Sequence, residues 1–333
     1  MKLPVIGITI GDPAGIGPEI VVKALHKYNF HPDCRVLLIG TELILRQEIE
    51  KQKIDMPIAI IRSPSVFPDN RNTVLVYDPG HVRILVYQMG QVQARCGQAA
   101  YEYLRQAADL AESGIIDALV TAPIHKEALR MAGISHIGHT EILADLTDSP
   151  DPLTMFEMAG LRVFFLSRHL SLRQAIEFVT RANVRNAITN CQQGLRKLGI
   201  STPKIAVAGL NPHCGDSGQF GTEEIDEIIP AIADARDAGI DVTGPIAADS
   251  IFHLGLEGHW DGILSLYHDQ GHIATKSIDF YSTVSVTLGL PFLRTSVDHG
   301  TAMDIAGKGI ANPESMYRAI LTAVQYIPYY QSK

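Results

Sequence analysis

Short runs of apolar, β-branched residues alternate along the chain with longer segments in which apolar positions recur at helical spacing. The first such run, residues 5–10, is followed by a glycine-rich turn and by a helical pattern over residues 18–27. Short apolar runs bounded by turn residues are typical of buried strands. Further strands are expected at 35–40, 117–121, 161–166, 204–209, 262–267 and 284–288, and further helices at 94–113, 183–198 and 314–327. This alternation predicts an α/β fold with a largely parallel sheet.

Composition and charge narrow the possible partners. The chain has 333 residues, 46% of them hydrophobic and 19% charged, which is enough for one large or two medium domains. Its net charge of -8 leaves no basic surface for nucleic acid, and no apolar run approaches the length of about 18 residues that a membrane span needs. Cys34, Cys96, Cys191 and Cys214 form no CxxC pair, and the first residues lack secretory-signal features. We therefore expect a cytoplasmic protein with reduced thiols and a small-molecule partner.

The glycine-rich turn, GDPAGIGPE over residues 11–19, lies between a predicted strand and a predicted helix. Helix N-terminal amides at such a turn can bind a phosphate or a carboxylate. The spacing matches neither GxGxxG nor GxxxxGK[ST], so neither the Rossmann nor the P-loop fingerprint applies. Two interpretations stay open: an anion site, and a structural turn from strand to helix.

Three histidines, His169, His213 and His268, each follow a predicted strand and lie beside turn-forming or polar residues. Ligands gather at the carboxyl ends of strands in a parallel sheet, so these segments can converge. Three imidazoles with an open fourth position suit a divalent metal that polarises a substrate oxygen. The alternative for each histidine alone is a hydrogen-bonded loop or core residue. Asp249 and Asp269 are candidates for a catalytic base, and equally for turn or cap residues.

Two further segments carry polar groups suited to anions. Residues 138–141, GHTE, combine a flexible glycine with the imidazole of His139 and the hydroxyl of Thr140, between structured blocks where a crossover between domains is expected. Lys276 and Arg294 flank the strand that begins near Val284 and can supply fixed positive charge, although as isolated features they are also compatible with surface cations.

The string from residue 299 to 313, HGTAMDIAGKGIANP, is rich in glycine and small residues, as in a loop that lies close to a ligand. Asp304 can accept hydrogen bonds from ribose hydroxyls, and Asn312 can recognise an adenine edge. A glycine-rich turn leading into the last helix explains the same residues.

Taken together, five strings resemble the 4-hydroxythreonine-4-phosphate dehydrogenase family of PdxA type, in order from about residue 5 to 320. They are GDPAGIGPE at 11–19, GHTE at 138–141, NPH at 211–213, YHDQG at 267–271 and RTSVDHGTA at 294–302. The loop at 299–313 is also similar to the adenosine-binding loop of isopropylmalate and isocitrate dehydrogenases. The resemblance implies a two-domain α/β/α subunit of the isocitrate/isopropylmalate dehydrogenase-like superfamily, without the Rossmann fingerprint.

The resemblance also implies an arrangement of domains and subunits. Residues 1–140 and 295–333 are expected to form a first domain with the cofactor-binding loop, and residues 141–294 a second domain with the metal-binding histidines. A homodimer is implied, with the active site in the interdomain cleft and residues from both subunits. His169, His213 and His268 match the metal ligands. The positions that match substrate-binding residues are His139, Thr140, Lys276 and Arg294.

The reaction implied is oxidation of the C3 hydroxyl of a four-carbon 4-phosphorylated hydroxy acid, followed by loss of CO2. It would use NAD or NADP and one divalent metal, Zn, Mg or Co, with Asp249, Asp269 and Lys276 as candidate catalytic groups. The cofactor would lie against the 299–313 loop, and Asp304 near a ribose favours NAD because a carboxylate repels the 2′-phosphate of NADP. The expected cofactor-binding residues are His299, Gly300, Thr301, Ala302, Asp304 and Asn312.

Two features bear on the substrate. Ser285 stands where family members usually carry asparagine, which alters the fit at that substrate-binding position. Residues 271–273, GHI, resemble the branch that acts on D-threonate or D-erythronate 4-phosphate, whose substrates carry a hydroxyl where 4-hydroxythreonine 4-phosphate carries an amine. A dehydrogenase of a non-phosphorylated diol acid and a metal-dependent binding protein without turnover are the alternatives.

Overall fold

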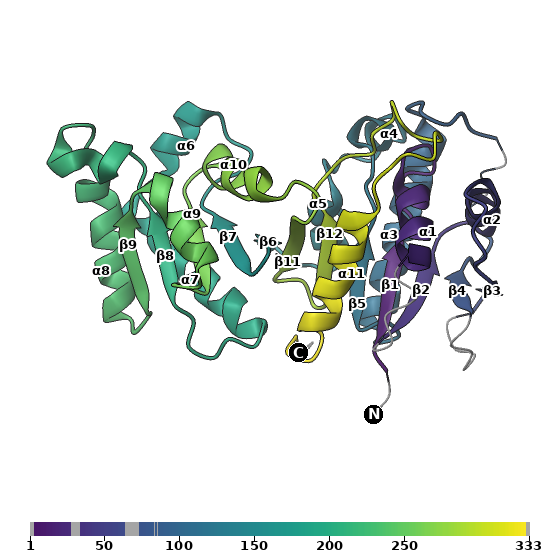
Figure 1. Ribbon diagram of the computed structural model, residues 1–333, viewed down its shortest axis with the longest axis horizontal. Coiled ribbons are helices and arrows are strands. Elements are labelled where there is room, and N and C mark those ends of the chain that lie inside the picture. The colour runs from purple at the N-terminus through teal and green to yellow at the C-terminus, as the bar shows by residue number, and fades with distance from the viewer. Residues whose placement is uncertain (1–2, 28–33, 64–72, 83, 85, 331–333) are drawn as a thin grey trace. The chain divides into compact units, whose positions relative to one another are not determined.

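The chain divides into two compact units in a computed structural model that describes residues 3–27, 34–63, 73–82, 84 and 86–330. Unit 1 comprises Met1–Pro152 and Val284–Lys333, and unit 2 comprises Leu153–Thr283. Each unit is a sheet covered by helices, so the predicted alternation of strands and helices is confirmed (Figure 1).

Unit 1 contains a sheet in the order β3-β4-β2-β1-β5-β12-β11. All of its strand pairs are parallel except β11 with β12, in which Thr287 lies opposite Arg294. The strands are β1 (Val5–Thr9), β2 (Arg35–Ile39), β3 (Ile58–Ile61), β4 (Val74–Tyr77), β5 (Ala118–Thr121), β11 (Val284–Leu288) and β12 (Leu293–Val297). The central strand β1 is buried along its whole length, as its uninterrupted run of β-branched residues predicts.

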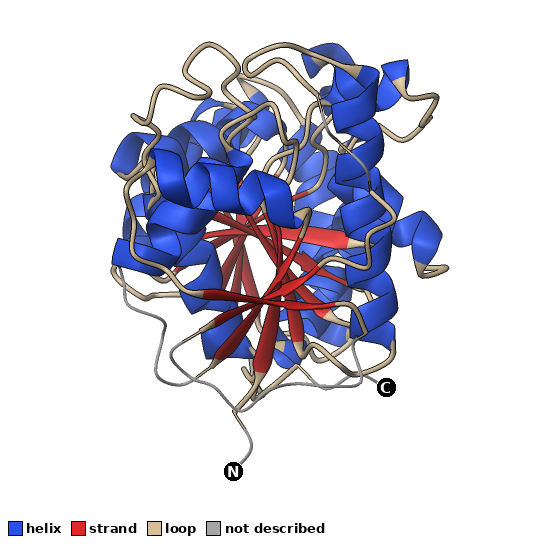
Figure 2. Cartoon of the chain, turned by 90° about the vertical axis from the view of Figure 1, so that its right-hand side faces the viewer, coloured by secondary structure: helices blue, strands red, loops and turns tan. Residues whose placement is uncertain are grey.

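Helices cover both sides of the unit 1 strands, as Figure 2 shows. The helix α1 packs against α2 and α11, whereas α3 packs against α4 and α5. The helices that the structure describes in this unit are α1 (Gly17–Lys27), α2 (Glu42–Lys51), α3 (Ala94–Glu112), α4 (Lys126–Met131), α5 (His139–Leu146) and α11 (Glu314–Tyr326). Their amphipathic faces bury the apolar residues of the sheet.

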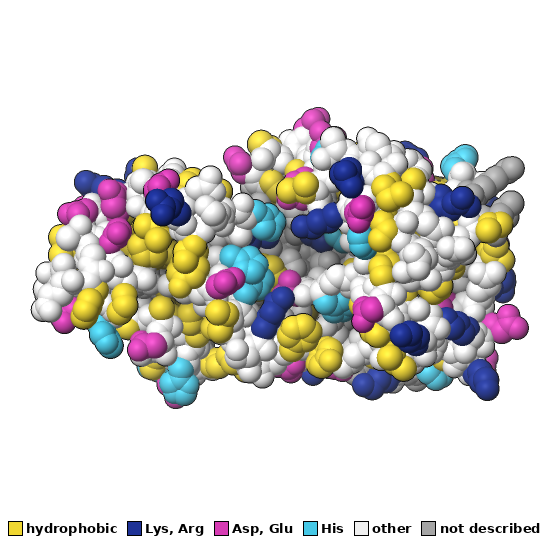
Figure 3. Space-filling model, turned by 90° about the horizontal axis from the view of Figure 1, so that it is seen from above, with side chains coloured by type: hydrophobic (Ala, Val, Ile, Leu, Met, Phe, Trp, Pro, Cys, Tyr) yellow, Lys and Arg dark blue, Asp and Glu magenta, His cyan; other side chains and the backbone are white. Residues whose placement is uncertain are grey.

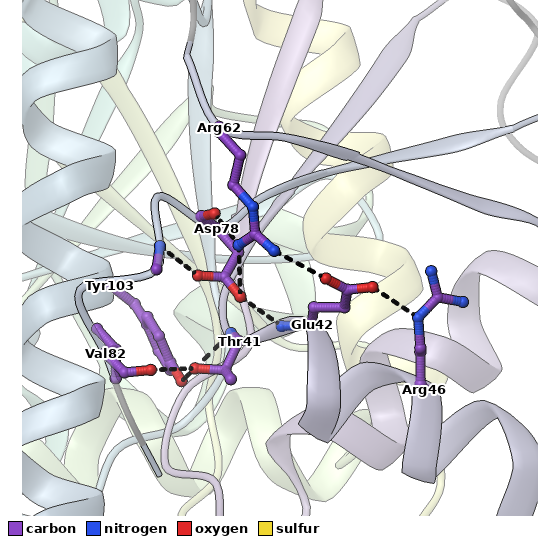
Figure 4. Close-up of polar contacts among 8 residues, drawn as sticks. Thr41, Glu42, Arg46, Arg62, Asp78, Val82 and Tyr103 are labelled. Atoms are coloured by element: carbon purple, nitrogen blue, oxygen red, sulfur yellow. Dashed lines mark hydrogen bonds and ion pairs between the residues drawn. The ribbon is translucent and has the colours of Figure 1, made fainter.

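A polar network fixes the start of α2 beside β4 (Figure 4). The Asp78 carboxylate accepts hydrogen bonds from the backbone N–H of Glu42, at 2.9 Å, and of Gly80, at 2.8 Å. Arg62 bridges Glu42, at 3.0 Å, and Asp78. A carboxylate at the first amides of a helix satisfies donors that have no intrahelical acceptor, so this network gives α2 a defined beginning.

Unit 2 contains a smaller sheet in the order β6-β7-β10-β8-β9, parallel except for β6 with β7. Its strands are β6 (Leu153–Met158), β7 (Leu161–Phe165), β8 (Ile205–Ala208), β9 (Val242–Ile246) and β10 (Gly262–Ser265). Its helical segments are α6 (Leu172–Phe178), α7 (Arg181–Lys197), η1 (Pro212–Gly218), η2 (Glu224–Ile228), α8 (Ile229–Asp237), α9 (Ala248–Leu256) and α10 (His268–Ile278). The β6–β7 hairpin turns at Ala159 and Gly160, whose φ values of 50° and 86° are those of a tight two-residue turn.

The unit boundaries differ from the domain boundaries expected at 140/141 and 294/295. Residues 141–152 and 284–294 belong to unit 1, because α5 packs on α3 and because β11 pairs with β12. The GHTE segment is therefore not a crossover between domains, and it instead begins the helix α5 inside unit 1. Cys34, Cys96, Cys191 and Cys214 form no disulfide in the part of the chain that the structure describes. Within the described ranges, no helix has both the length and the apolar character needed to cross a membrane.

Candidate active site

A buried arginine forms the centre of a polar cluster in unit 1. Arg294 on β12 is only 3% exposed. Its guanidinium donates hydrogen bonds to the hydroxyls of Thr121 (2.8 Å), Thr287 (2.9 Å) and Thr140 (3.3 Å). These threonines come from the end of β5, from β11 and from the first turn of α5. The three hydroxyls hold the planar donor group in one orientation, as recognition of an anion by a fork of N–H groups requires.

The N-terminus of α5 adds to the positive character of this cluster. The helix begins at His139 and its first turn contains Thr140. First-turn amides have no intrahelical acceptors, and the helix dipole favours a negative charge there. The arginine, the threonine and the helix start therefore form a candidate anion site within unit 1.

His139 is a partly buried imidazole at the same helix start. Burial, with a contribution from the charge of Arg294, holds the pKa of His139 well below its usual range, so the ring is neutral. Its Nε2 lies 3.0 Å from the Ala122 carbonyl oxygen, which can only accept, so Nε2 carries the proton and Nδ1 is an acceptor. His139 thus suits a substrate hydroxyl better than a phosphate.

Ser285 lies beside this cluster on β11. It is two residues from Thr287 along the strand, so both side chains are on the same face of the sheet. Across the strand pair it is opposite Ser296, whose hydroxyl accepts from the Thr121 hydroxyl at 2.9 Å. The Thr121 hydroxyl in turn accepts from Arg294 at 2.8 Å, so Ser285 lies opposite a residue that is hydrogen-bonded within the arginine cluster.

The 299–313 loop belongs to unit 1 and runs without regular secondary structure into α11. Asp304 and Asn312 are exposed, and a Cβ at Gly300 would meet nothing within 4 Å. The Asn312 side-chain oxygen accepts from the backbone N–H of Glu314 at 3.0 Å, which leaves its NH2 group as the donor. Thr301 is buried, Ala302 has a φ of 43°, and His299 Nδ1 lies 3.0 Å from the Gly300 carbonyl oxygen. The open glycine, the carboxylate and the amide fit a dinucleotide that lies along the loop.

The three predicted metal ligands follow neighbouring strands of unit 2. His169, His213 and His268 come after β7, β8 and β10, and these strands are adjacent in the order β7-β10-β8. Figure 3 views the end of the molecule at which α10 begins and shows histidine and cationic side chains open at the surface. The described residues contain no group of three or more histidine, cysteine or acidic side chains arranged to hold a metal ion. The donor chemistry suits a metal, but the described residues of one chain do not bring these three histidines together as a ligand set.

His213 lies in a strained turn. Residues 213–217 in η1 all have positive φ, with 52° at His213 and 56° at Cys214. For residues other than glycine this left-handed conformation costs roughly 1–2 kcal/mol each. The buried carboxylate of Glu224 anchors the start of the turn, because it accepts from the backbone N–H of Leu210, at 2.8 Å, and of Asn211, at 2.7 Å. Strain of this kind is typical of functional segments.

On α10, His268 and Asp269 form a close pair. The Nδ1 of His268 lies 2.6 Å from an Asp269 carboxylate oxygen, an arrangement that leaves Nε2 available to a ligand. His272 lies one turn further along, with its ring centroid 4.2 Å from that of His268 and 4.9 Å from that of Phe165. Burial, with the nearby charges of His268, Lys276 and Arg168, lowers the pKa of His272 to about 3.

The remaining catalytic candidates lie on α9 and α10. Lys276 is in the last turn of α10, with its Nζ 5.7 Å from the centre of the Phe280 ring. Asp249 is exposed in the first turn of α9. Burial raises the pKa of Cys214, and the charges of Glu224 and Asp249 add to this effect.

The structure therefore brings some of the predicted site residues close together and leaves others apart. Within unit 1 it gathers Arg294, Thr140 and His139, and within unit 2 it pairs His268 with Asp269. Sequence reasoning missed Thr121 and Thr287 as partners of Arg294. Thr121 is the last residue of a predicted strand. The rule that ligands gather at the carboxyl ends of parallel strands, which pointed to the histidines, also points to Thr121.

The fold and these residues define an α/β protein with a buried, hydrogen-bonded arginine cluster in one unit and strand-end histidines in the other. The family model for "Pyridoxal phosphate biosynthetic protein PdxA" matches residues 32–323. The chain belongs to the PdxA family. The predicted family and the fold class, an α/β/α subunit without the Rossmann fingerprint, are confirmed.

Several named relatives are similar to this chain over nearly its full length. A Clostridium botulinum protein named "Putative D-threonate 4-phosphate dehydrogenase" is 50% identical over 98% of this chain and 97% of its own, and a Halalkalibacterium halodurans protein with the same name is 50% identical over 99% and 98%. The solved 4-hydroxythreonine-4-phosphate dehydrogenase of Klebsiella pneumoniae has 39% identity and a TM-score of 0.86 over 97% of this chain and 99% of its own. A terephthalate 1,2-cis-dihydrodiol dehydrogenase of Burkholderia xenovorans has 28% identity and a TM-score of 0.65 over 97% and 98%.

Proposed function

We propose that this protein is a dehydrogenase that oxidises the C3 hydroxyl of a four-carbon 4-phosphorylated hydroxy acid and then releases CO2. D-threonate or D-erythronate 4-phosphate is the proposed substrate, with dihydroxyacetone phosphate as the organic product. The relatives at 50% identity that carry the D-threonate 4-phosphate dehydrogenase name support this choice. Hydride would leave C3 for NAD or NADP, and the resulting 3-keto acid would lose its β-carboxylate.

The observation that carries the proposal is the candidate anion site of unit 1. Arg294 is buried and donates to the hydroxyls of Thr121, Thr287 and Thr140, the last of which lies at the start of α5. Such fixed donors bind a phosphate or a carboxylate with little loss of side-chain entropy, and binding at this remote group orients the reacting carbon. A doubly anionic substrate is the ligand that this site suits best.

The chain's own residues have distinct parts in the proposed reaction. The neutral His139 offers Nδ1 to a substrate hydroxyl, and the Asp269–His268 pair and Lys276 are the candidate proton carriers in unit 2. A bound divalent metal would supply Lewis-acid stabilisation of negative charge on the substrate oxygen, and the nicotinamide would supply the hydride acceptor. The exposed Asp304 carboxylate favours NAD over NADP.

A second copy of the chain is part of the proposal. His169, His213 and His268 are exposed and do not form a metal site among the described residues of one chain, so groups from a partner would complete the set. Unit 2 also exposes large apolar side chains on α6, on the segment from η1 to α8, and around α10, and exposed apolar surface of this kind marks protein interfaces. These side chains include Leu172, Phe178, Phe220, Ile225, Ile229, Ile273 and Phe280.

Each alternative substrate differs from the proposed 4-phospho acid in one chemical group that the test can distinguish. 4-Hydroxythreonine 4-phosphate has an amine at C2, and it is named in the Klebsiella structure. A non-phosphorylated diol acid lacks the phosphate, and the Burkholderia diol dehydrogenase makes this the second candidate. Arg294 favours the phosphorylated class, because its buried guanidinium suits a strong anion.

The test is the absorbance of reduced nicotinamide, with NAD or NADP, a divalent metal and one substrate at a time. We expect turnover with the four-carbon 4-phospho acids, most of all with D-threonate or D-erythronate 4-phosphate, and with NAD as the better cofactor. Turnover confined to diol acids would support the alternative dehydrogenase. No signal with any substrate and metal would favour a binding protein without catalysis.

A further inference from the structure

The 299–313 loop has no regular secondary structure of its own, so other segments must hold its shape. Its first part is fastened to the GDPAGIGPE turn: the backbone N–H of Ile16 donates to the Thr301 carbonyl oxygen at 3.0 Å. The contact is close, because a Cβ on Gly15 would lie 2.9 Å from the Cβ of Thr301. Glycine at position 15 therefore allows the turn to pack directly on the loop.

The last part of the loop is fastened to α1. The ammonium of Lys23 donates to the carbonyl oxygens of Gly309, at 2.8 Å, and Ala311, at 3.1 Å, and to the carboxylate of Glu19, at 2.6 Å. The same Glu19 oxygen accepts from the backbone N–H of Ala311 at 2.8 Å. We call this pair of side chains the Glu19–Lys23 latch. It makes four hydrogen bonds, and three of them end on the backbone of the loop.

Burial makes the latch stronger than an ordinary helix ion pair. Glu19 is 2% exposed and Lys23 is 19% exposed. Charged hydrogen bonds in a site shielded from water are stronger than those between exposed side chains. By contrast, the i,i+4 pair of Arg46 with Glu42 on α2 is 54% and 27% exposed, and pairs of that kind contribute little.

The GDPAGIGPE turn itself is not open to an anion from solvent. Residues 11–19 are all buried. A Cβ on Gly17 would lie 2.3 Å from the Ile10 carbonyl oxygen, so the backbone is packed too closely there to admit a ligand group. Of the two interpretations of this motif, the structure supports the structural one, and the motif ends at Glu19, the acidic member of the latch.

We propose that Glu19 and Lys23 are positioning residues for the dinucleotide: they hold Gly309–Ala311, and thereby the adjacent Asn312, in the conformation that binds the adenosine end of NAD. This inference rests on the proposed function, because the loop is assigned to the cofactor there. Neither side chain touches the reacting atoms. Loss of the latch should therefore weaken cofactor binding, because the loop would have to become ordered during binding, and should leave the chemical step unchanged.

The experiment compares Lys23→Met, Lys23→Arg and Arg46→Met with the unmodified protein. For each variant, KM for NAD and kcat at saturating NAD are measured, and hydrogen exchange of the loop amides at 299–313 is measured without ligand. For Lys23→Met we expect a rise of about tenfold in KM, a change of less than about twofold in kcat, and faster exchange in the loop. Lys23→Arg should restore most of the affinity because it keeps the charge and donors, and the matched control Arg46→Met should behave as the unmodified protein.

Two results would overturn the inference while leaving the proposed function intact. One is an unchanged KM for NAD in Lys23→Met, and the other is a fall in kcat at saturating NAD with no change in KM. If Lys23→Met is too unstable to assay, Glu19→Gln gives the same test, because the amide retains an acceptor for Ala311 but lacks the charge. Failure of the unmodified protein to bind NAD or NADP would instead overturn the proposed function and, with it, the cofactor role of the latch.

Discussion

The polar centre of unit 1 and that of unit 2 differ in how complete they are. In unit 1, Arg294 is 3% exposed and donates to three hydroxyls, so the chain's own packing fixes the orientation of its guanidinium. In unit 2, His169, His213 and His268 follow adjacent strands but do not form a three-ligand set among the described residues. The arginine cluster of unit 1 is organised by its own packing, whereas the three histidines of unit 2 are exposed and not gathered into one group among the described residues.

This difference separates two kinds of mutational effect. Arg294, Thr121 and Thr287 in the unit 1 cluster are buried and hydrogen-bonded, so a change there affects folding as well as binding. The histidines of unit 2 are exposed, so a change there should affect the reaction and leave the folded chain nearly intact. The comparison therefore predicts large losses of activity in both units, and a loss of stability chiefly in unit 1.

The largest effect is expected from His213→Ala. Loss of one of three imidazoles should remove the bound metal and lower kcat by on the order of 10⁴-fold, with little change in Tm because the side chain is exposed. Metal content by elemental analysis, steady-state kinetics and thermal unfolding check this. His259→Ala, at an exposed histidine elsewhere in unit 2, is the control. Retained metal with near-normal kcat would remove His213 from the site.

Arg294→Met should lower kcat/KM by about 10³-fold, because the anion loses a fork of charged donors. It should also lower Tm, since three threonine hydroxyls lose their shared donor. Arg294→Lys should recover only part of the loss, because a lysine cannot donate as a planar fork. Arg130→Met, at an exposed cation of unit 1, is the control. Full activity of Arg294→Met would disprove the anion site.

The fold could be predicted well where the hydrophobic period is regular. The expected strand at 284–288 and helix at 94–113 match β11 and α3, within one residue at the end of the helix. Prediction from the sequence missed five strands, β3, β4, β6, β9 and β12. Of these, β6 and β12 pair antiparallel with their neighbours. A two-residue turn of Ala159 and Gly160 has no strong hairpin signature in the sequence, and its left-handed φ values are imposed by the strands on either side.

The candidate site was predictable in its residue types but not in its connections. The rule that ligands gather at the carboxyl ends of parallel strands pointed to the histidines, and the positive charge of Arg294 suggested an anionic ligand. That Arg294 is held by Thr121 and Thr287 depends on β12 lying between β5 and β11, an arrangement of strands distant in sequence. The Glu19–Lys23 latch also joins α1, near the start of the chain, to Gly309 and Ala311, near its end. Neither periodicity nor local motifs encode contacts between such distant segments.

A smaller effect, on the pH dependence of stability, is expected at Asp12, a buried carboxylate of unit 1. Burial raises the pKa of Asp12 from 3.8 to about 6, although the Ala14 N–H and His125 lower it. The folded state therefore holds the proton more tightly, and its stability falls as the pH rises from about 4 to 6. Above pH 6 the ionised carboxylate costs about 3 kcal/mol.

Asp12→Asn cannot ionise, so its stability relative to the unmodified protein should improve between about pH 4 and pH 8 by on the order of 2–3 kcal/mol. The free energy of unfolding in urea at both pH values measures this change. Asp55→Asn, at an exposed aspartate of the same unit, should show almost none. An Asp12→Asn difference that is the same at both pH values would contradict the prediction.

The smallest effect is expected at Ser285, which lies beside the Arg294 cluster of unit 1 and is a candidate for distinguishing between substrates. Ser285→Asn should raise the ratio of kcat/KM for 4-hydroxythreonine 4-phosphate to that for D-threonate 4-phosphate by about tenfold, because a longer amide offers a new acceptor to the C2 amine. Ser285→Ala is the control, since it removes the hydroxyl without adding an amide and should change both substrates alike. Ser285 shares a sheet face with Thr287, a partner of Arg294. A constant ratio in Ser285→Asn would mean that the neighbouring arginine binds the anion common to both substrates while another position distinguishes amine from hydroxyl.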